Sequence, residues 1–255
     1  MGALVGKTVC MVGARGKMGI AIKDAFLLSD SGVSGIVDVD PFLGTEAYHK
    51  IEEVDLADHK DGIHLVINFT NPKATLESAR WCMTHKIPLI CGTTGLSARD
   101  QEELGRIAHI IPVLWAPNMS LGVNLIDALL PQLKPLKEFD IEIVEAHHRL
   151  KKDSPSGTAM RWAKTLASAF GRKVVNSRPE GVSQGRDKED IYVHAMRGGT
   201  VPGEHTVYFF GPDEVIEITH RAASRLIFAK GAVMAAKWII GQPPGFYSMK
   251  EVLGL

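Results

Sequence analysis

The run EAHHRLKKDSPSGTA, at residues 145–159, brings together the side chains best suited to chemistry in this sequence. His147, His148 and Lys151 follow an expected strand over residues 140–145, so they lie where that strand ends. A histidine or lysine whose pKa lies near the working pH can deliver a proton to a reacting group. The run therefore predicts a site of proton transfer; the alternative is a solvated loop in front of a capped helix.

The second half of the same run predicts a place for an anion. Ser156, Gly157 and Thr158 begin an expected helix over residues 158–170 and would offer hydroxyls and free backbone N–H groups. Lys151 adds a full positive charge beside them. Together these groups suit the carboxylates of a small substrate.

A second chemical motif lies near the start of the chain. Gly13, Gly16 and Gly19 separate an expected buried strand over residues 8–12 from a helical pattern. Missing side chains there would let the backbone approach a pyrophosphate, whose charge the helix N-terminus stabilises. The spacing is G-x-x-G-x-x-G rather than the commoner G-x-G-x-x-G, so a plain glycine-rich turn is the alternative to a dinucleotide site.

Asp38 adds to the dinucleotide interpretation. It lies at the end of the second expected strand, 19 residues beyond Gly19, where a carboxylate can accept hydrogen bonds from ribose hydroxyls. A carboxylate there repels a 2′-phosphate, and Val39 offers no guanidinium to bind one, which favours NADH. Arg15 and Lys17 lie in the adjacent turn and leave NADPH open. The alternative is a solvated carboxylate at a strand end.

Two further loops follow expected parallel strands, at residues 92–95 and 116–119. Loops at the carboxyl ends of parallel strands face the ligand crevice of an open α/β sheet. We therefore expect contacts with the nicotinamide side of the cofactor, against the alternative of ordinary turns.

The elements that must position these motifs fall into two patterns. Up to about residue 120, short apolar strands alternate with helices, which predicts an α/β fold with a Rossmann-like, doubly wound parallel sheet. Residues 121–222 then combine two helices with alternating strands, which predicts a second α+β domain for substrate binding and oligomerisation. Its helices are expected over residues 122–133 and 158–170, a polar, mobile loop over residues 172–190, and alternating strands over residues 191–196, 205–210 and 215–220. Residues 223–255 return to helical periodicity and are expected to complete the dinucleotide-binding domain, residues 1–120.

Composition excludes several classes of function. Lys and Arg total 29 and Asp and Glu total 29, so no global field favours nucleic acid or an anionic membrane. We find no export signal and no apolar run long enough to span a bilayer. Cys10, Cys82 and Cys91 are odd in number and lack paired spacing, which favours a reduced, cytoplasmic protein.

Metal and serine-hydrolase chemistry fit poorly. Adjacent His147 and His148 cannot both face one ion from a regular strand, and neither an HExxH motif nor a cysteine pair supports zinc. No GxSxG elbow is present. We therefore expect no metal site.

Several other polar residues receive no chemical role from the sequence. His194, His205 and His220 are expected on strand faces or in the core. Glu145 and Asp153 flank the chemical residues without an assigned function.

The residues quoted so far, with the runs VGARGKMG, NFTNP, CGTTG and APNMSLGVN, resemble the 4-hydroxy-tetrahydrodipicolinate reductase family, formerly called dihydrodipicolinate reductase. The resemblance covers nearly the whole chain and continues through the C-terminal run from residue 197 to MKEVLGL. It implies an NAD(P)H-dependent reductase of the diaminopimelate route to lysine, acting on a small dicarboxylate as a homotetramer. Val39, where some members carry a phosphate-reading arginine, leaves cofactor preference open.

The resemblance also implies residue roles. His147 would be the proton donor or acceptor and Lys151 the proton donor, with His148, Gly157 and Thr158 contacting substrate beside Ser156. The cofactor contacts would be Gly13, Ala14, Arg15, Gly16, Lys17, Met18, Asp38, Gly92, Thr93, Thr94, Ala116, Pro117, Asn118 and Met119. The sequence leaves two alternatives: a reductase of another imine or amino acid on the same scaffold, and a nicotinamide-binding regulator without catalysis.

Overall fold

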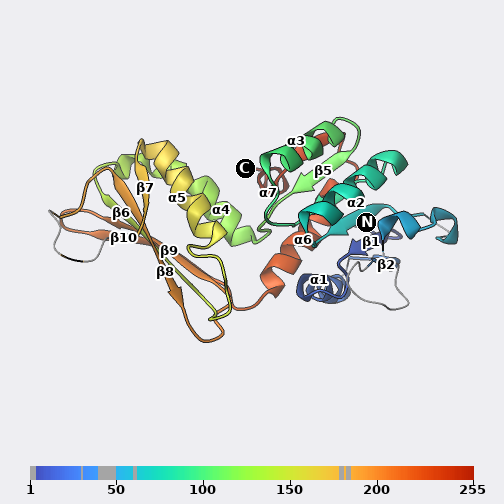
Figure 1. The fold of residues 1–255 in the computed structure, drawn as a ribbon, viewed down its shortest axis with the longest axis horizontal. Coiled ribbons are helices and arrows are strands. Elements are labelled where there is room, and N and C mark those ends of the chain that lie inside the picture. Colours follow the sequence, from blue (N-terminus) through green and yellow to red (C-terminus); the bar gives the residue numbers. More distant parts are fainter. Residues whose placement is uncertain (1–3, 30, 40–49, 60–61, 178–180, 182–184) are drawn as a thin grey trace. The chain divides into compact units, whose positions relative to one another are not determined.

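The computed structural model describes residues 4–29, 31–39, 50–59, 62–177, 181 and 185–255. The chain divides into two units (Figure 1). The first contains Met1–Leu121 and Arg225–Leu255, and the second contains Gly122–Ser224.

The first unit is built on a six-stranded sheet in which every pair of neighbours is parallel. The strand order is β11-β5-β4-β3-β1-β2. Its strands are β1 (Thr8–Val12), β2 (Gly35–Val39), β3 (Leu65–Asn68), β4 (Leu89–Cys91), β5 (Pro112–Trp115) and β11 (Gly245–Tyr247). Its helices are α1 (Lys17–Leu28), α2 (Pro72–His85), α3 (Ala98–Ile107), α6 (Leu226–Ile239) and α7 (Met249–Leu253), with short 3₁₀ turns η1 (Ile51–Glu53) and η2 (Leu56–Asp58).

The strands are apolar throughout because both faces of this sheet are covered. Val9 and Met11 of β1 point into a core shared with α1 and α6. Cys10 and Val12 point into the opposite core, with residues of α2 and α3. Side chains alternate between faces along a strand, so a continuous apolar run supplies both cores. The expected doubly wound parallel sheet is confirmed.

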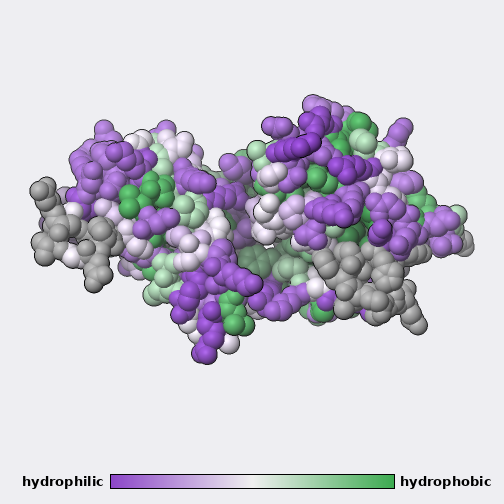
Figure 2. Space-filling model, viewed as in Figure 1, coloured by the Kyte–Doolittle hydropathy of each residue, from purple (hydrophilic) through white to green (hydrophobic). Residues whose placement is uncertain are grey.

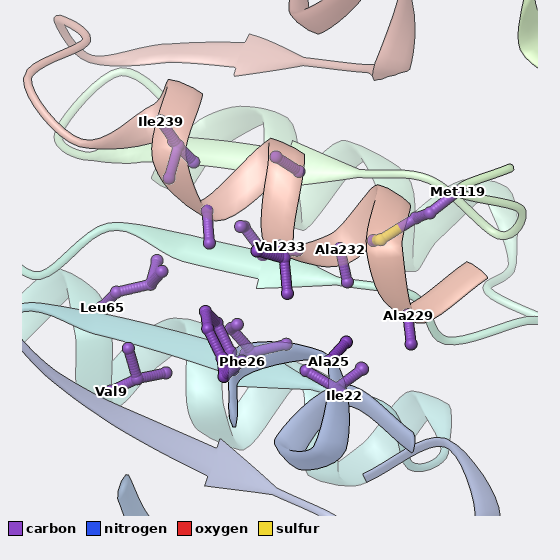
Figure 3. Packing of buried hydrophobic residues seen from close by; sticks show 14 of the residues in the cluster. Val9, Ile22, Ala25, Phe26, Leu65, Met119, Ala229, Ala232, Val233 and Ile239 are labelled. Atoms are coloured by element: carbon purple, nitrogen blue, oxygen red, sulfur yellow. The ribbon is translucent and has the colours of Figure 1, made fainter. Parts of the chain in front are cut away.

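The C-terminal helix α6 lies beside α1 on one face of the sheet. Figure 3 shows small and branched side chains of α6 meeting those of α1: Ala229, Ala232 and Val233 against Ile22, Ala25 and Phe26. Gly231 brings α6 onto the loop after β5, because a Cβ there would lie 1.7 Å from the carbonyl oxygen of Met119. Helix α6 therefore supports one of the loops expected to contact cofactor.

The second unit has a mixed five-stranded sheet of order β10-β9-β6-β8-β7. The central strand β6 pairs antiparallel with β9 and parallel with β8. The elements are α4 (Leu121–Leu129), η3 (Leu130–Leu136), β6 (Asp140–His147), α5 (Gly157–Phe170), β7 (Lys173–Asn176), β8 (Asp190–Arg197), β9 (Glu204–Phe210) and β10 (Val215–Arg221). Helix α5 and η3 pack on one face, over a core that contains Trp162 and Phe209.

Two local expectations need correction, and two short elements were not predicted. The helix expected over residues 122–133 ends at Leu129, because Pro131 lacks an N–H and its ring obstructs continuation of an α-helix. Part of the irregular loop expected over residues 172–190 is strand β7; residues 178–180 and 182–184 of that loop lie outside the described residues. Strand β11 and helix α7 were not predicted, because each is short.

The face of the molecule in Figure 2 is mainly hydrophilic, with hydrophobic residues in smaller areas. Within the described part of the chain, no helix has both the length and the apolar character needed to cross a bilayer.

Two helical glycines make a matched test of the α6 packing. Gly231→Ala should lower the free energy of unfolding by about 2 kcal/mol or more, because the new methyl group meets backbone that must move. Gly105→Ala in α3 meets nothing within 4 Å and should stabilise by up to about 1 kcal/mol through helix propensity. Urea unfolding of both variants measures the difference, and equal effects would contradict the close approach.

Candidate active site

Strand β6 sets the orientation of the chemical residues in the second unit. Its residues alternate between intermediate and buried, so Glu145 and His147 share the covered face with Ile141 and Ile143. Glu145 is 0% exposed and His147 is 8% exposed. The strand ends at His147, two residues later than expected.

Glu145 is the best-bonded carboxylate of this site. Its Oε2 lies 2.6 Å from Nδ1 of His147, and its Oε1 accepts a hydrogen bond of 2.9 Å from the Ser156 backbone N–H. Arg197 donates to both oxygens, at 2.8 Å each. Burial would raise the pKa of Glu145, but the hydrogen bonds from His147, Arg197 and Ser156 outweigh it and lower the pKa to about 2. The carboxylate is therefore ionised at neutral pH.

Arg197 is the residue that the sequence interpretation missed. Parallel pairing of β6 with β8 puts Arg197 beside His147, although 52 residues separate it from Glu145. Its guanidinium also donates to the backbone oxygen of Asp153 at 2.6 Å, which holds the loop after β6. No local motif marks this arginine; the available signal was that a buried glutamate requires a cation.

Ser156 caps helix α5 and is itself buried. Its Oγ accepts a 3.2 Å hydrogen bond from the Ala159 N–H and lies 2.9 Å from Nε2 of His205. The helix expected after residue 156 is confirmed, with its cap. The Ser156 hydroxyl is thus bonded within the protein, and its contact with substrate stays a prediction.

His205 is part of the same cluster. It is 4% exposed and pairs with Glu145 across β9 and β6, and its ring meets those of His147 and Trp162 edge to face at 5.0 Å and 5.6 Å. Burial, followed by the charge of His147, lowers the pKa of His205 to about 3. His205 is therefore a neutral core histidine that orients Ser156.

Lys151 lies in the loop between β6 and α5. Its Nζ is 2.8 Å from Oδ1 of Asp153, and its backbone N–H donates to the His148 carbonyl at 3.1 Å. Burial would raise the pKa of Asp153, but the Lys151 hydrogen bond and charge outweigh it and lower that pKa. Gly157, at the start of α5, is exposed, and a Cβ there would meet nothing within 4 Å. The space beside Gly157 is therefore open, while its backbone N–H donates a hydrogen bond to the Asp153 carboxylate, which also lowers the pKa of Asp153.

The first unit contains the predicted glycine turn. Gly13 has φ +86°, and a Cβ there would lie 2.8 Å from the Phe69 carbonyl oxygen. A Cβ at Gly19 would lie 2.2 Å from the Gly13 carbonyl oxygen, so α1 packs directly on the turn. Gly16 is the N-cap of α1 and provides no side-chain cap for the helix N–H groups. This geometry fits a bound pyrophosphate.

Asp38 has a partner that the sequence interpretation did not anticipate. Nζ of Lys23, on α1, donates to its Oδ2 at 2.7 Å. Both side chains are partly exposed. The carboxylate expected to accept ribose hydroxyls is therefore balanced by a cation on the adjacent helix.

The other predicted cofactor residues lie in loops after β4 and β5. Some shape these loops: Thr93 is buried with its Oγ1 2.7 Å from Oγ1 of Thr75, and Met119 is buried against α6. A Cβ at Gly92 would lie 2.1 Å from the Phe69 ring. Others are open to solvent, namely Thr94 and Pro117. The carboxyl edge of the sheet thus brings together the turn after β1 and both loops.

No group of three His, Cys, Asp or Glu side chains that could hold a metal occurs among the residues described. Burial raises the pKa of the Cys10 thiol to about 12, so this thiol stays protonated at neutral pH.

The low pKa of His205 predicts how the second unit responds to acid. The unfolded chain takes up a proton near pH 6.5, whereas the folded protein resists protonation until about pH 3. The stabilisation is present above pH 6.5 and is lost as the pH falls toward 3, with a slope of at most about 1.4 kcal/mol per pH unit. His205→Gln should flatten this slope, measured by hydrogen exchange of β6 amides; equal slopes would contradict the assignment.

Both units have relatives of one family. The family described as dihydrodipicolinate reductase matches with its N-terminal part at residues 7–119 and its C-terminal part at residues 122–253. The chain is 40% identical to the 4-hydroxy-tetrahydrodipicolinate reductase of Geobacter metallireducens, over 97% of this chain and 98% of the relative. It is 46% identical to the enzyme of the same name from Geotalea uraniireducens, over 79% and 77%.

A solved structure shares the fold of the whole chain. The dipicolinate-bound dihydrodipicolinate reductase from Paenisporosarcina sp. TG-14 is 19% identical, with a TM-score of 0.75 over 95% of this chain and 97% of the other. At that identity the likeness concerns the fold alone.

Proposed function

This chain belongs to the dihydrodipicolinate reductase family, and we propose that its two units divide the reaction between hydride delivery and proton delivery. The chain is an NAD(P)H-dependent oxidoreductase that reduces 4-hydroxy-tetrahydrodipicolinate to tetrahydrodipicolinate, in the diaminopimelate route to lysine. The reaction consumes NAD(P)H and one proton, and the 4-hydroxyl leaves as water. The observation that carries this function is that both halves of the family match in order, so the glycine turn and residues 145–159 both fall inside the match.

Proton delivery is assigned to the end of β6. When bound, the nicotinamide supplies a hydride to the conjugated, imine-bearing ring of the substrate, where negative charge then develops. His147 is the proposed proton donor or acceptor; Glu145 holds its Nδ1, so Nε2 remains to exchange a proton. Lys151 is the proposed proton donor, on a loop that Arg197 anchors at Asp153.

Substrate binding is assigned to the start of α5. The first N–H groups of a helix attract anions, and at Gly157 the N–H already bonds to the Asp153 carboxylate. A substrate carboxylate would take the place of Asp153 at that N–H, where the space beside the residue is open. His148, Ser156 and Thr158 are the further proposed contacts, and Lys151 supplies positive charge. This arrangement suits a small dicarboxylate.

The assignment is tested with enzymatically generated 4-hydroxy-tetrahydrodipicolinate, by following the absorbance of NADH and NADPH. Lys151→Ala should lower kcat about 100-fold or more through loss of a proton donor, while the Kd for NADH changes less than about twofold. The neighbouring Lys152→Ala removes the same charge from an exposed side chain and should keep kcat near the wild-type value. No substrate-dependent oxidation by the wild type with either cofactor would contradict the function.

Cofactor preference is assigned to Asp38 and its neighbours. We propose that the enzyme favours NADH, because Asp38 suits ribose hydroxyls and Val39 provides no cation for a 2′-phosphate. The ion pair with Lys23 supports additional use of NADPH, since it offsets the repulsion between Asp38 and a phosphate.

Direct binding measurements test this preference without turnover. Lys23→Met should raise the ratio of the Kd for NADPH to the Kd for NADH by about fivefold, because Asp38 then repels the 2′-phosphate unopposed. Lys73→Met, which removes an exposed lysine paired with Glu77, is the matched control and should leave the ratio unchanged. A ratio that Lys23→Met does not alter would remove Lys23 from cofactor choice.

We further propose that the protein assembles as a homotetramer in the cytoplasm. The sheet face opposite α5 exposes apolar side chains, among them Met196, Phe210 and Val215, and Phe210 stacks on Tyr208. This face supports subunit contact in a homotetramer. The free, buried cysteines support a cytoplasmic location.

Sedimentation of the wild type tests the assembly. We expect a tetramer, and Phe210→Asp should shift the population to smaller species, because it puts a charge into an apolar contact. A monomeric wild type at assay concentrations would contradict the proposal.

A further inference from the structure

Glu145 does not itself exchange a proton in the reaction proposed above, yet it bonds to the histidine that does. Its carboxylate is fully buried and receives hydrogen bonds from His147, Arg197 and Ser156. A buried charge of this kind is costly unless it is paired. Two of these contacts, with His147 and with Arg197, affect the state of the His147 ring.

The first contact determines the tautomer of His147. The ionised Glu145 carries no proton, so Nδ1 of His147 must donate across the 2.6 Å that separates them. The neutral imidazole then presents its lone pair at Nε2, and the imidazolium presents an N–H there. Space next to Nε2 is kept by Gly203, since a Cβ at that residue would lie 2.9 Å from the nitrogen.

The second contact limits the effect of that carboxylate. A free glutamate at this distance would strongly favour the imidazolium form of His147. Arg197 binds both oxygens of Glu145, so the carboxylate and guanidinium together are close to neutral. Arg197 thereby also repels a proton on His147, which works against the attraction of Glu145.

We propose that Glu145 and Arg197 are positioning residues for the reaction: Glu145 holds His147 with Nε2 toward the reacting atoms and favours its protonated form, and Arg197 restrains that preference. The inference rests on the proposed role of His147 in proton transfer. According to this proposal, the charged side chains of Glu145 and Arg197 have opposite effects on His147.

Other titratable groups lie near His147 and are left in place by both substitutions. His205 approaches from β9 with its ring centroid 5.0 Å away, and His220 on β10 lies close enough to affect His205. Lys151 and Asp153 approach from the loop after β6 and pair with each other. None of these groups bonds Nδ1 of His147, which Glu145 occupies.

Two substitutions separate the effects. Glu145→Gln removes the negative charge and should move the pH at which the His147 ring signals change to a lower value. Arg197→Gln leaves Glu145 unopposed and should move that pH to a higher value. Histidine NMR of the enzyme without substrate measures both, with His147 assigned through His147→Gln. The ¹⁵N shifts should show Nδ1–H in the wild type and a mixture of tautomers in Glu145→Gln.

Kinetics provide the second measurement. Glu145→Gln should lower kcat about 10- to 100-fold, while the KM for substrate changes less than about twofold. The pH limb, meaning the part of the pH profile where kcat/KM falls as His147 changes its protonation, should move in the same direction as the NMR midpoint. Glu145→Asp keeps the charge and should keep the limb within about half a unit of the wild type. Retained chemical shifts of His194 and His205 in the same spectra check that the second unit of each variant is folded, and an unchanged Kd for NADH checks the first unit.

A matched control lies on the opposite face of the same strand. Glu142 also joins a histidine and an arginine, with Oε2 2.8 Å from Nε2 of His194 and Oε1 3.1 Å from Nε of Arg186. Glu142→Gln breaks the same kind of triad without touching His147, and should leave the pH limb unchanged.

The outcomes distinguish this inference from the proposed function. Shifts of opposite sign in Glu145→Gln and Arg197→Gln support the inference. Shifts of the same sign, or none, overturn it even when the wild type is active. If His147→Gln leaves the pH limb of kcat/KM in place, the proposed role of His147 in catalysis is wrong. The NMR titration then still decides whether Glu145 and Arg197 govern the protonation of His147.

Discussion

A buried carboxylate that must stay ionised organises the second unit. Removing the charge of Glu145 from water costs several kcal/mol, and only close, directed partners offset it. The partners come from three segments: His147 from the same strand, Arg197 from β8 and Ser156 from the start of α5. Meeting that one requirement fixes the strand end, the following loop and the helix cap relative to one another.

The first unit relies on close backbone approach instead of buried charge. Glycines 13, 19 and 92 each lie where a Cβ would meet backbone or an aromatic ring at 2.8 Å or less. The missing side chains let the turn, α1 and the loop after β4 come together at the carboxyl edge of the sheet. The cofactor site proposed for the first unit depends on shape, whereas the proton transfer proposed for the second unit depends on controlled charge.

Local signals predicted most of the elements. The apolar run at residues 8–12 forms β1, Ser156 caps the helix that follows it, and alternation in residues 205–220 gives two paired strands. Prediction failed where an element was too short to show a period, as in β11, or where Pro131 ended a helix early. Periodicity describes which face is buried, and short segments contain too few residues to show it.

The sequence by itself determined which residues could do chemistry and in which order they occur, because residue type and local spacing are properties of the chain. Only the tertiary structure decided what holds those residues. Arg197 reaches Glu145 across 52 positions, and His205 reaches Ser156 across 49. Such contacts depend on which strands pair and in what register, and that is settled by burying whole faces of a sheet rather than by any single residue.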